Sequence, residues 1–368
     1  MKLEQPFSSH ITAKSTTHTH SLPTINRRWW PFILLISGVL GFFLLRLALG
    51  SVSIPLSEII SILLGEGAAK ASWESIVINF RLPEALTATL AGAALGVSGL
   101  MMQTLFRNPL AGPFILGISS GASLGVAFVV LALGTVGTVT IAGMSLLGDF
   151  TLAIGAGVGA GITLLLVLAV ARAVQNSTTL LVLGLMFGYL TSAVVGLLLY
   201  LSIPERIQAY INWTFGTFSG VTWSQLTIMI PFILLGLALS FFLMKPLNAL
   251  LLGEHYAASM GLHVARVRLW IIFITALLAG TITAFAGPIG FIGIAVPHLC
   301  RTLFATSDHR MLIPGTMLMG ALVALIAGLV ADVPGSQLVL PLNAITSLIG
   351  APVVIWVILR RRHIRMTT

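Results

Sequence analysis

Long apolar runs, separated by short polar segments, follow one another along the chain after its first 30 residues. Most runs are close to the roughly 20 residues that a helix needs to cross the hydrocarbon core of a bilayer. The pattern therefore predicts an all-α fold, a polytopic membrane helical bundle with about ten transmembrane helices. The ten expected spans are residues 31–50, 82–104, 113–134, 149–171, 179–201, 223–244, 269–287, 289–304, 311–331 and 343–359.

Composition agrees with a membrane protein. Hydrophobic residues make up 57% of the 368 residues and charged residues only 8%, whereas soluble domains carry about 25% charged residues. A chain with so few charges cannot cover a soluble surface. Its single cysteine, Cys300, excludes an internal disulfide.

The hydropathy pattern also divides the chain. Residues 1–30 are polar and rich in Ser, Thr and His, so we expect a disordered cytoplasmic tail rather than a signal peptide. Residues 31–362 form one transmembrane domain, and residues 363–368 form a short cytoplasmic tail. The longest predicted inner loop lies at residues 246–268.

The distribution of Lys and Arg predicts the orientation. With the N-terminus inside, only four of the 19 basic residues fall on the outer side, which leaves 15 on the inner side. The positive-inside rule then places both termini in the cytoplasm. The net charge of +9 lies mostly at the cytoplasmic membrane surface, so no nucleic-acid partner is needed to explain it. The four outer residues are Arg46, Lys70, Arg81 and Arg206.

None of the ten acidic residues lies in the middle of an expected span. Ion-coupled transporters usually need ionisable groups inside the membrane to carry protons or bind cations. The chain also lacks a Walker A string, so we do not expect it to hydrolyse ATP itself. If it is a transporter, its energy should come from another subunit.

Small residues favour close helix packing. Four of them recur at a spacing of four residues along the fifth span and form one smooth stripe: Gly184, Gly188, Ser192 and Gly196. The triplet Ala-Gly-Pro occurs twice, at 111–113 and 286–288, at opposite expected faces of the membrane. This fits an inverted internal repeat, although three matching residues can also arise by chance.

Four stretches carry a family resemblance. The segment "RLPEALTATLAGAALGVSGLMMQTLFRNPLAGPFILGISSGASLG" spans residues 81–125, and three further stretches lie at 250–268, 286–301 and 340–362. Their order and spacing resemble the FecCD family, the permease subunits of type II ABC importers for ferric siderophores, haem and cobalamin. The resemblance runs from about residue 31 to 362.

The resemblance implies a multi-pass subunit of the bacterial inner membrane that pairs with a second permease subunit, a homodimer being favoured over a heterodimer. It also implies two cytoplasmic ATPase subunits, which bind ATP and Mg, and an external substrate-binding protein. No cofactor is expected on this chain. A ferric siderophore is the expected cargo, with haem or cobalamin as the alternative.

Family resemblance also assigns two gate turns at the cytoplasmic mouth of the path. The first contains Asn108 and Leu110, in a turn where Pro109 cannot continue the preceding helix. The second contains Ser177 and Thr178. Ordinary helix-connecting turns remain the alternative for both.

By the same resemblance, residues 246–268 form the coupling segment that docks on the ATPase. The segment mixes apolar and polar residues, and two glycines should break it into short helices. We expect Glu254 to face a basic group of the ATPase; a surface helix lying on the headgroups is the alternative. The expected coupling residues are Leu252, Gly253, Glu254, Ala257, Ala258, Met260 and Gly261.

The outer surface departs from the family pattern. Many members carry an arginine where this chain has Glu84, and another in the stretch that corresponds to residues 331–343, which has none here. Because such arginines commonly meet acidic residues of the binding protein, docking is expected to use Lys70, Arg81 or Arg206 instead.

Other chemistry is weakly signalled. Residues 96–99 match the GxSG string of intramembrane serine proteases, but a serine needs a base. His298 is the only histidine within an expected span, and nothing in the sequence shows that it meets Ser98. We expect His298 to be packed at the cytoplasmic end of its span. His18 and His20 are too few to predict a metal site, so no metal is expected.

Overall fold

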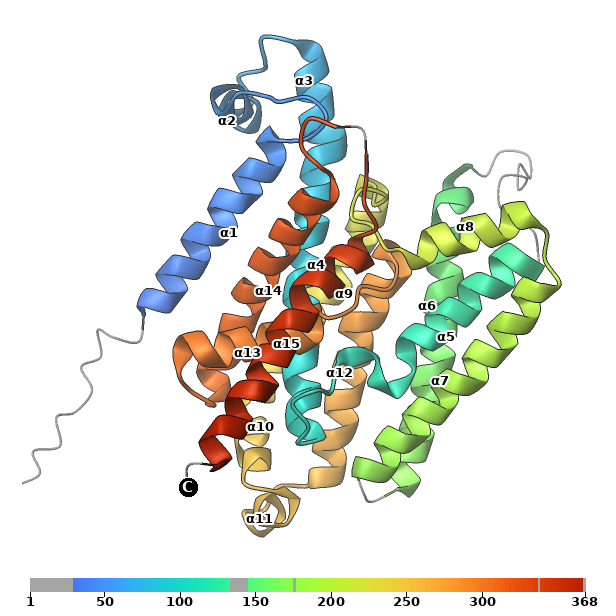
Figure 1. Cartoon of the computed structure of the whole chain (residues 1–368), viewed down its shortest axis with the longest axis vertical. Helices are drawn as coiled ribbons and strands as arrows, with labels where there is room; N and C mark the ends of the chain where they lie inside the picture. The colour runs from blue at the N-terminus through green and yellow to red at the C-terminus, as the bar shows by residue number, and fades with distance from the viewer. Residues whose placement is uncertain (1–28, 133–144, 175–176, 337, 367–368) are drawn as a thin grey trace, which may run out of the picture.

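The computed structural model describes residues 29–132, 145–174, 177–336 and 338–366. These residues form helices and connecting turns, without a strand among them (Figure 1). Most of the 1–30 tail and the last two residues lie outside the described residues. The predicted all-helical bundle is confirmed.

Each of the ten expected spans corresponds to a helix. Seven helical segments are long and apolar enough to cross a membrane, whereas the segments 118–132, 292–304 and 342–356 are shorter. Backbone groups in lipid must be satisfied internally, so a long apolar run can only be helical. The ten helices are α1 (Trp30–Ala48), α4 (Leu82–Leu105), α5 (Ile118–Ala127), α6 (Ser145–Ala173), α7 (Ser177–Tyr200), α9 (Trp223–Phe242), α12 (Val264–Ala286), α13 (Ile292–Phe304), α14 (His309–Ala331) and α15 (Leu342–Met366).

The expected span 113–134 is interrupted. A 3-10 turn, η3 (Pro113–Leu116), ends at Gly117, whose φ of +77° is left-handed. The helix α5 starts only after that turn and continues into a π-helical stretch, η4 (Phe128–Ala132). A left-handed residue breaks the regular hydrogen bonding of a helix, which is why this span is short.

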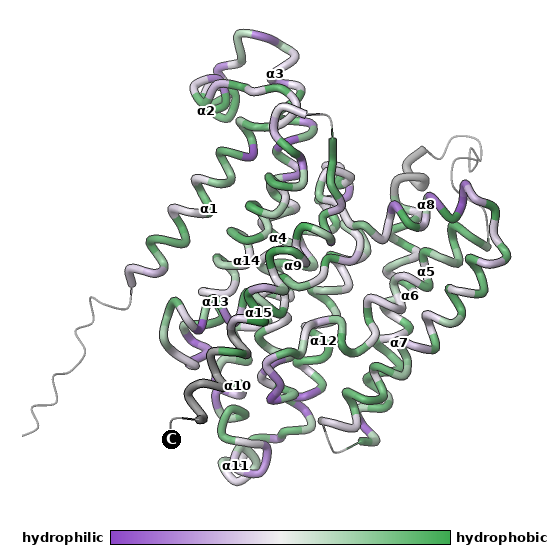
Figure 2. The backbone as a smooth tube through the Cα atoms, viewed as in Figure 1, coloured by the Kyte–Doolittle hydropathy of each residue, from purple (hydrophilic) through white to green (hydrophobic). Residues whose placement is uncertain are grey.

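Five further helices lie at the two ends of the bundle: α2 (Leu56–Leu64), α3 (Ala71–Ile76), α8 (Pro204–Thr214), α10 (Met244–Leu251) and α11 (Glu254–Ser259). Figure 1 shows α2, α3 and α8 at one end, which we call the α2 end, and α10 and α11 at the other, which we call the α11 end. Hydrophilic residues gather at these ends, with an apolar band between them (Figure 2).

The central helix is α4, which packs against α9, α12, α13 and α14. Glycines set its closest contacts, because a Cβ on Gly92 would overlap the carbonyl oxygen of Gly320, and one on Gly99 would overlap that of Gly293. Such backbone contact is how helices gain packing energy where no hydrophobic effect drives them together.

The small-residue stripe of α7 is used over part of its length. A Cβ on Gly184 would lie 2.7 Å from the carbonyl oxygen of Ile115, and one on Gly188 would lie 3.5 Å from Ser120 Oγ. Ser192 is exposed, and a Cβ on Gly196 would meet no atom within 4 Å. The first half of the stripe therefore packs against η3 and α5, and the second half faces outward.

The two Ala-Gly-Pro triplets lie at opposite ends. The first follows α4 at the α11 end, and the second contacts the α8 region, where Thr217 N donates to Ala286 O (2.9 Å). Each leads into one of the short helices, α5 and α13. This arrangement is the one that an inverted repeat requires.

Candidate functional site

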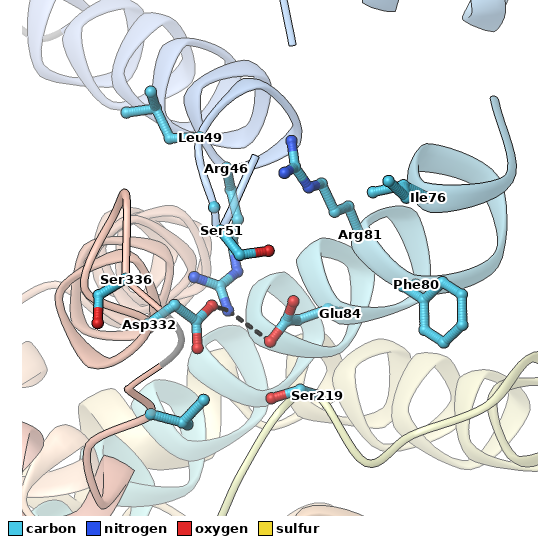
Figure 3. Close-up of a pocket in the computed structure, with 12 residues that line it drawn as sticks. Arg46, Leu49, Ser51, Ile76, Phe80, Arg81, Glu84, Ser219, Asp332 and Ser336 are labelled. Atoms are coloured by element: carbon cyan, nitrogen blue, oxygen red, sulfur yellow. Dashed lines mark hydrogen bonds and ion pairs between the residues drawn. The ribbon is translucent and has the colours of Figure 1, made fainter. Parts of the chain in front are cut away.

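A cavity of about 490 Å³ lies at the α2 end. It is lined by residues of α1, the connection after α1, the stretch from the end of α3 to the start of α4, the loop before α9 and the segment after α14 (Figure 3). Arg46, Glu84 and Asp332 converge on it from three helix ends, and Ser219 lies beside Glu84.

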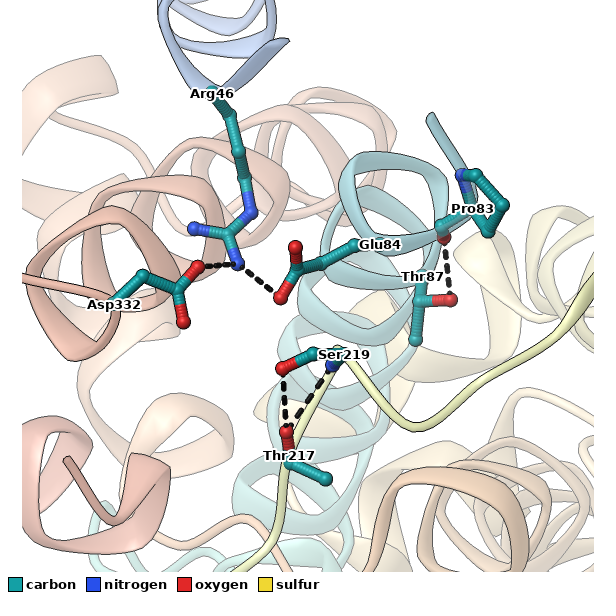
Figure 4. A network of polar contacts seen from close by, with 7 residues as sticks. All are labelled: Arg46, Pro83, Glu84, Thr87, Thr217, Ser219 and Asp332. Atoms are coloured by element: carbon teal, nitrogen blue, oxygen red, sulfur yellow. Dashed lines mark hydrogen bonds and ion pairs between the residues drawn. The ribbon is translucent and has the colours of Figure 1, made fainter. Parts of the chain in front are cut away.

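These three charged residues form a buried ion cluster. Arg46 Nη2 lies 2.7 Å from Asp332 Oδ2 and 2.8 Å from Glu84 Oε1 (Figure 4). The side chains are only 3%, 13% and 23% exposed for Arg46, Glu84 and Asp332. Removing charges from water is costly unless they are paired, so this cluster fixes α1 to α4 and α14. Sequence reasoning missed it, since the partners lie far apart in the chain.

The prediction that Arg81 docks a binding protein is wrong. Its side chain is 6% exposed, and its guanidinium donates to the carbonyl oxygens of Leu47 (2.7 Å), Ala48 (3.1 Å) and Val52. These bonds hold the end of α1 and the chain that follows it, because the last carbonyls of a helix lack helical partners.

The other two docking candidates differ from Arg81. Lys70 is exposed and lies over the ring of Trp73, 4.8 Å from its centroid. Arg206 is half-buried at the start of α8 and donates to Leu131 O (3.1 Å). Docking through these two residues stays a prediction.

At the α11 end, the first gate turn is built as expected for a turn after a helix. Asn108 Oδ1 accepts a hydrogen bond from Leu110 N (2.9 Å), the local side-chain bond that favours asparagine in turns. Leu110 is 42% exposed. Buried His298 lies with Nε2 2.8 Å from Pro109 O, so its predicted packing is confirmed and it ties α13 to this turn.

The second gate turn is only partly described. Residues 175–176 lie outside the described residues; Ser177 begins α7, and Thr178 is exposed in its first turn. Just before it, Val174 O accepts a hydrogen bond from Arg268 Nη1 (2.9 Å). The start of α12 is therefore attached to the end of α6, beside this turn.

The coupling segment is divided as predicted. Gly253 and Gly261, with φ of +111° and +85°, stand on either side of α11. Leu252, Ala258 and Met260 are exposed, as a docking surface requires. By contrast, Gly253 and Ala257 are buried within the chain, so these two cannot offer side-chain surface to a partner.

Glu254 has a basic partner in its own chain. Its carboxylate lies 3.2 Å from Nη2 of Arg268, whose side chain is almost fully buried. This pair fixes α11 to α12. The Glu254 side chain is still 32% exposed, so its contact with a basic group of the ATPase stays a prediction. No local sequence pattern indicates the contact between Glu254 and Arg268, which joins residues 14 positions apart.

A polar network that sequence reasoning also missed joins α10 to the core. Asn248 Nδ2 donates to Asp308 Oδ1 (2.6 Å), and Asn248 Oδ1 accepts from His309 N (2.8 Å). The other side of the His309 ring reaches Thr104 Oγ1, 2.8 Å from Nε2. Burial alone would raise the pKa of Asp308, but the bonds from Arg310 N and Asn248 outweigh it and lower the pKa.

Ser98 and His298 are bonded to different partners. The hydroxyl of Ser98 is buried and donates to Ala94 O within α4 (2.6 Å), while His298 bonds Pro109 instead. Among the described residues, no group of three or more His, Cys, Asp or Glu could hold a metal ion.

A polytopic helical bundle around a glycine-packed central helix is the architecture of a membrane-embedded protein, and similarity to known membrane transport permeases gives its class. The chain belongs to the FecCD transport family, whose model matches residues 35–360. The family resemblance and the class of protein predicted from the sequence are thereby confirmed. The chain is a permease of a type II ABC importer and a multi-pass membrane protein.

Three similar proteins span nearly the whole chain. The hemin transport system permease protein HmuU of Yersinia pestis is 36% identical over 343 residues, 93% of this chain and 99% of the relative. The vitamin B12 import system permease protein BtuC of Citrobacter koseri is 36% identical over 85% of this chain and 93% of the relative. A solved inward-facing ABC transporter of metal-chelate type superposes with a TM-score of 0.74 at 29% identity, covering 89% of this chain and 98% of that one.

Proposed function

We propose that this chain is the permease subunit of an ATP-driven importer for a metal-bound tetrapyrrole, haem or cobalamin. The observation that carries the proposal is the 36% identity, over most of the chain, to permeases named for hemin and for vitamin B12. The ferric siderophore expected from the sequence receives less support, since neither name refers to one. Haem and cobalamin are both kept as candidate cargoes because the two relatives are equally similar to this chain.

The proposed assembly has two copies of this chain in a bacterial inner membrane, two cytoplasmic ATPase subunits and an external binding protein. Its α11 end faces the cytoplasm, together with both termini. The excess of basic residues at the expected inner segments supports this orientation. The α2 end, with Lys70 and Arg206, then faces the binding protein.

The α11 end offers a direct route from ATPase to gate. The exposed residues of the coupling segment, Leu252, Ala258 and Met260, would contact the ATPase. Behind them, a Cβ on Gly253 would lie 3.6 Å from Arg107 Nη1, so the segment lies beside the first gate turn. Closure of the ATPases would push α10 and α11, and the push would reach Asn108 and Leu110 from there.

The Asn248–His309–Thr104 network gives a second path. It connects α10 to the last turns of α4, which directly precede the gate turn. Because each member is hydrogen-bonded on both sides, the network would transmit displacement rather than absorb it. The gate would therefore move as α10 moves, without any chemistry on this chain.

Reconstitution tests the proposal. The chain should co-purify with a P-loop ATPase, and proteoliposomes holding both, supplied with the binding protein, should accumulate haem or cobalamin only when ATP is present. Uptake of ferric siderophores alone would overturn the proposed cargo. Failure to associate with any ATPase, or uptake without ATP, would overturn the importer assignment itself.

A further inference from the structure

An apolar groove lies where α12 packs against both α6 and α9. Figure 1 shows the positions of these three helices in the bundle. Its cavity volume is about 340 Å³, within the range of small-molecule sites. Small residues of α6 form its floor: a Cβ on Gly157 or Gly161 would meet no atom within 4 Å. Phe232 and Phe273 line it from α9 and α12. The groove, which we also call the furrow, lies between apolar helices and is open toward the surroundings of the bundle.

A second cavity, also of about 340 Å³, continues this furrow toward the α11 end. The two cavities share Phe273, whose ring packs edge-to-face against Trp270 at a centroid distance of 5.9 Å. Arg172 of α6 and Arg266 of α12 line the second cavity from opposite sides. One continuous surface therefore changes from apolar to basic along α12.

The two arginines are available to a ligand. Both are exposed, and the salt bridges found in the described part of the chain use Arg46 and Arg268 instead. Guanidinium groups bind phosphate oxygens through paired hydrogen bonds. Tryptophan favours the membrane–water interface, so Trp270 marks the depth at which a lipid headgroup would lie.

We propose that this groove binds one anionic glycerophospholipid, with its phosphate between Arg172 and Arg266 and an acyl chain in the furrow beside Gly157 and Gly161. Charge complementarity selects an anionic headgroup, since nothing acidic lines the basic cavity. Basic pockets between transmembrane helices on the cytoplasmic side are suited to anionic lipids. The proposal does not depend on the cargo of the importer.

Such a lipid would add a connection between α6 and α12, which already pack against each other. At the α11 end, α6 ends and α12 begins. There, Arg268 of α12 already donates to Val174 O, directly after α6. A phosphate held by Arg172 and Arg266 would add a second connection a few residues away. The lipid would therefore stabilise the position of α12 next to the coupling segment.

Lipid binding to the full-length chain tests the proposal. The purified protein in neutral-detergent micelles is titrated with phosphatidylglycerol, and bound lipid is counted by native mass spectrometry. The Arg172→Gln/Arg266→Gln double variant should bind phosphatidylglycerol at least tenfold more weakly, with phosphatidylcholine binding unchanged. Arg310→Gln is the matched control, because Arg310 is also exposed at the α11 end but outside both cavities.

A second variant tests the acyl-chain half. Gly157→Leu places a side chain in the open furrow and should displace the lipid while both arginines remain. In the wild-type protein, inorganic phosphate should not compete with the lipid, because it lacks the acyl chain that fills the furrow. Equal phosphatidylglycerol binding by wild type and the double arginine variant would overturn the proposal. So would normal lipid binding combined with loss of ATPase binding in Arg266→Gln, which would assign Arg266 to the subunit interface.

Discussion

At the scale of single residues, buried charges decide where this chain differs from a plain hydrophobic bundle. Arg46 lies between Glu84 and Asp332 with almost no solvent contact. A buried charge that loses its partner lowers the folding stability strongly, whereas a complete ion cluster contributes little net free energy to folding. The three residues should therefore behave as a unit.

Replacing Arg46 by methionine should destabilise the protein by about 3–5 kcal/mol, since two carboxylates would be left facing each other in a buried site. Thermal unfolding in detergent measures the effect. Adding Glu84→Gln and Asp332→Asn to the same chain should recover most of the loss. An unchanged melting temperature for Arg46→Met alone would mean that the cluster is solvated.

Glu254 and Arg268 allow a sharper test, because their charges can be exchanged. Glu254→Lys should weaken the attachment of α11 to α12 by a few kcal/mol and reduce ATP-dependent uptake, with membrane insertion unchanged. The double variant Glu254→Arg/Arg268→Glu should restore part of the uptake. If the single variant transports normally, the pair carries no coupling; if the exchange fails to rescue, Glu254 has a further role outside the pair.

At the scale of elements, helix positions could be predicted from sequence far better than contacts. The ten spans follow from run length because lipid leaves a long apolar segment no alternative to a helix. The break at Gly117 was missed, since glycine is common within membrane helices and its left-handed φ cannot be seen in a sequence. Arg81 was misassigned for a similar reason: burial by carbonyl groups 29 to 34 residues away has no local signal.

The packing of α4 gives a prediction at the same scale. Gly99→Ala should prevent correct folding, because the added methyl group would overlap the backbone of Gly293, which cannot move aside. Gly196→Ala is the matched control, since the same methyl group would meet no atom of this chain. Size-exclusion chromatography of the detergent-extracted protein compares the two. A monodisperse Gly99→Ala protein at wild-type yield would show that α4 and α13 are farther apart.

At the scale of the whole molecule, the exposed Leu110 is the feature that a second subunit would explain. In the proposed homodimer, we expect the two copies of this residue to approach each other near the dimer axis at the cytoplasmic mouth. In a chain whose native Cys300 is replaced by serine, Leu110→Cys should form an inter-subunit disulfide whose yield changes between nucleotide-free and ATP-bound states. A cysteine at exposed Lys70, at the other end, is the control and should not cross-link. No cross-link at position 110 in any nucleotide state would refute this placement.

The glycine contacts also determine which parts of the molecule can shift during a transport cycle. Where two backbones touch with no side chain between them, as at Gly92 with Gly320, sliding by even one residue would drive neighbouring Cβ atoms into the opposite chain. The same holds between α5 and α6, at Gly125 with Gly155. By contrast, a Cβ on Gly280 of α12 would lie at an ordinary 3.7 Å from Ala160. We therefore expect two stiff blocks, one around α4 and one around α6, with α12 as the seam along which alternating access takes place.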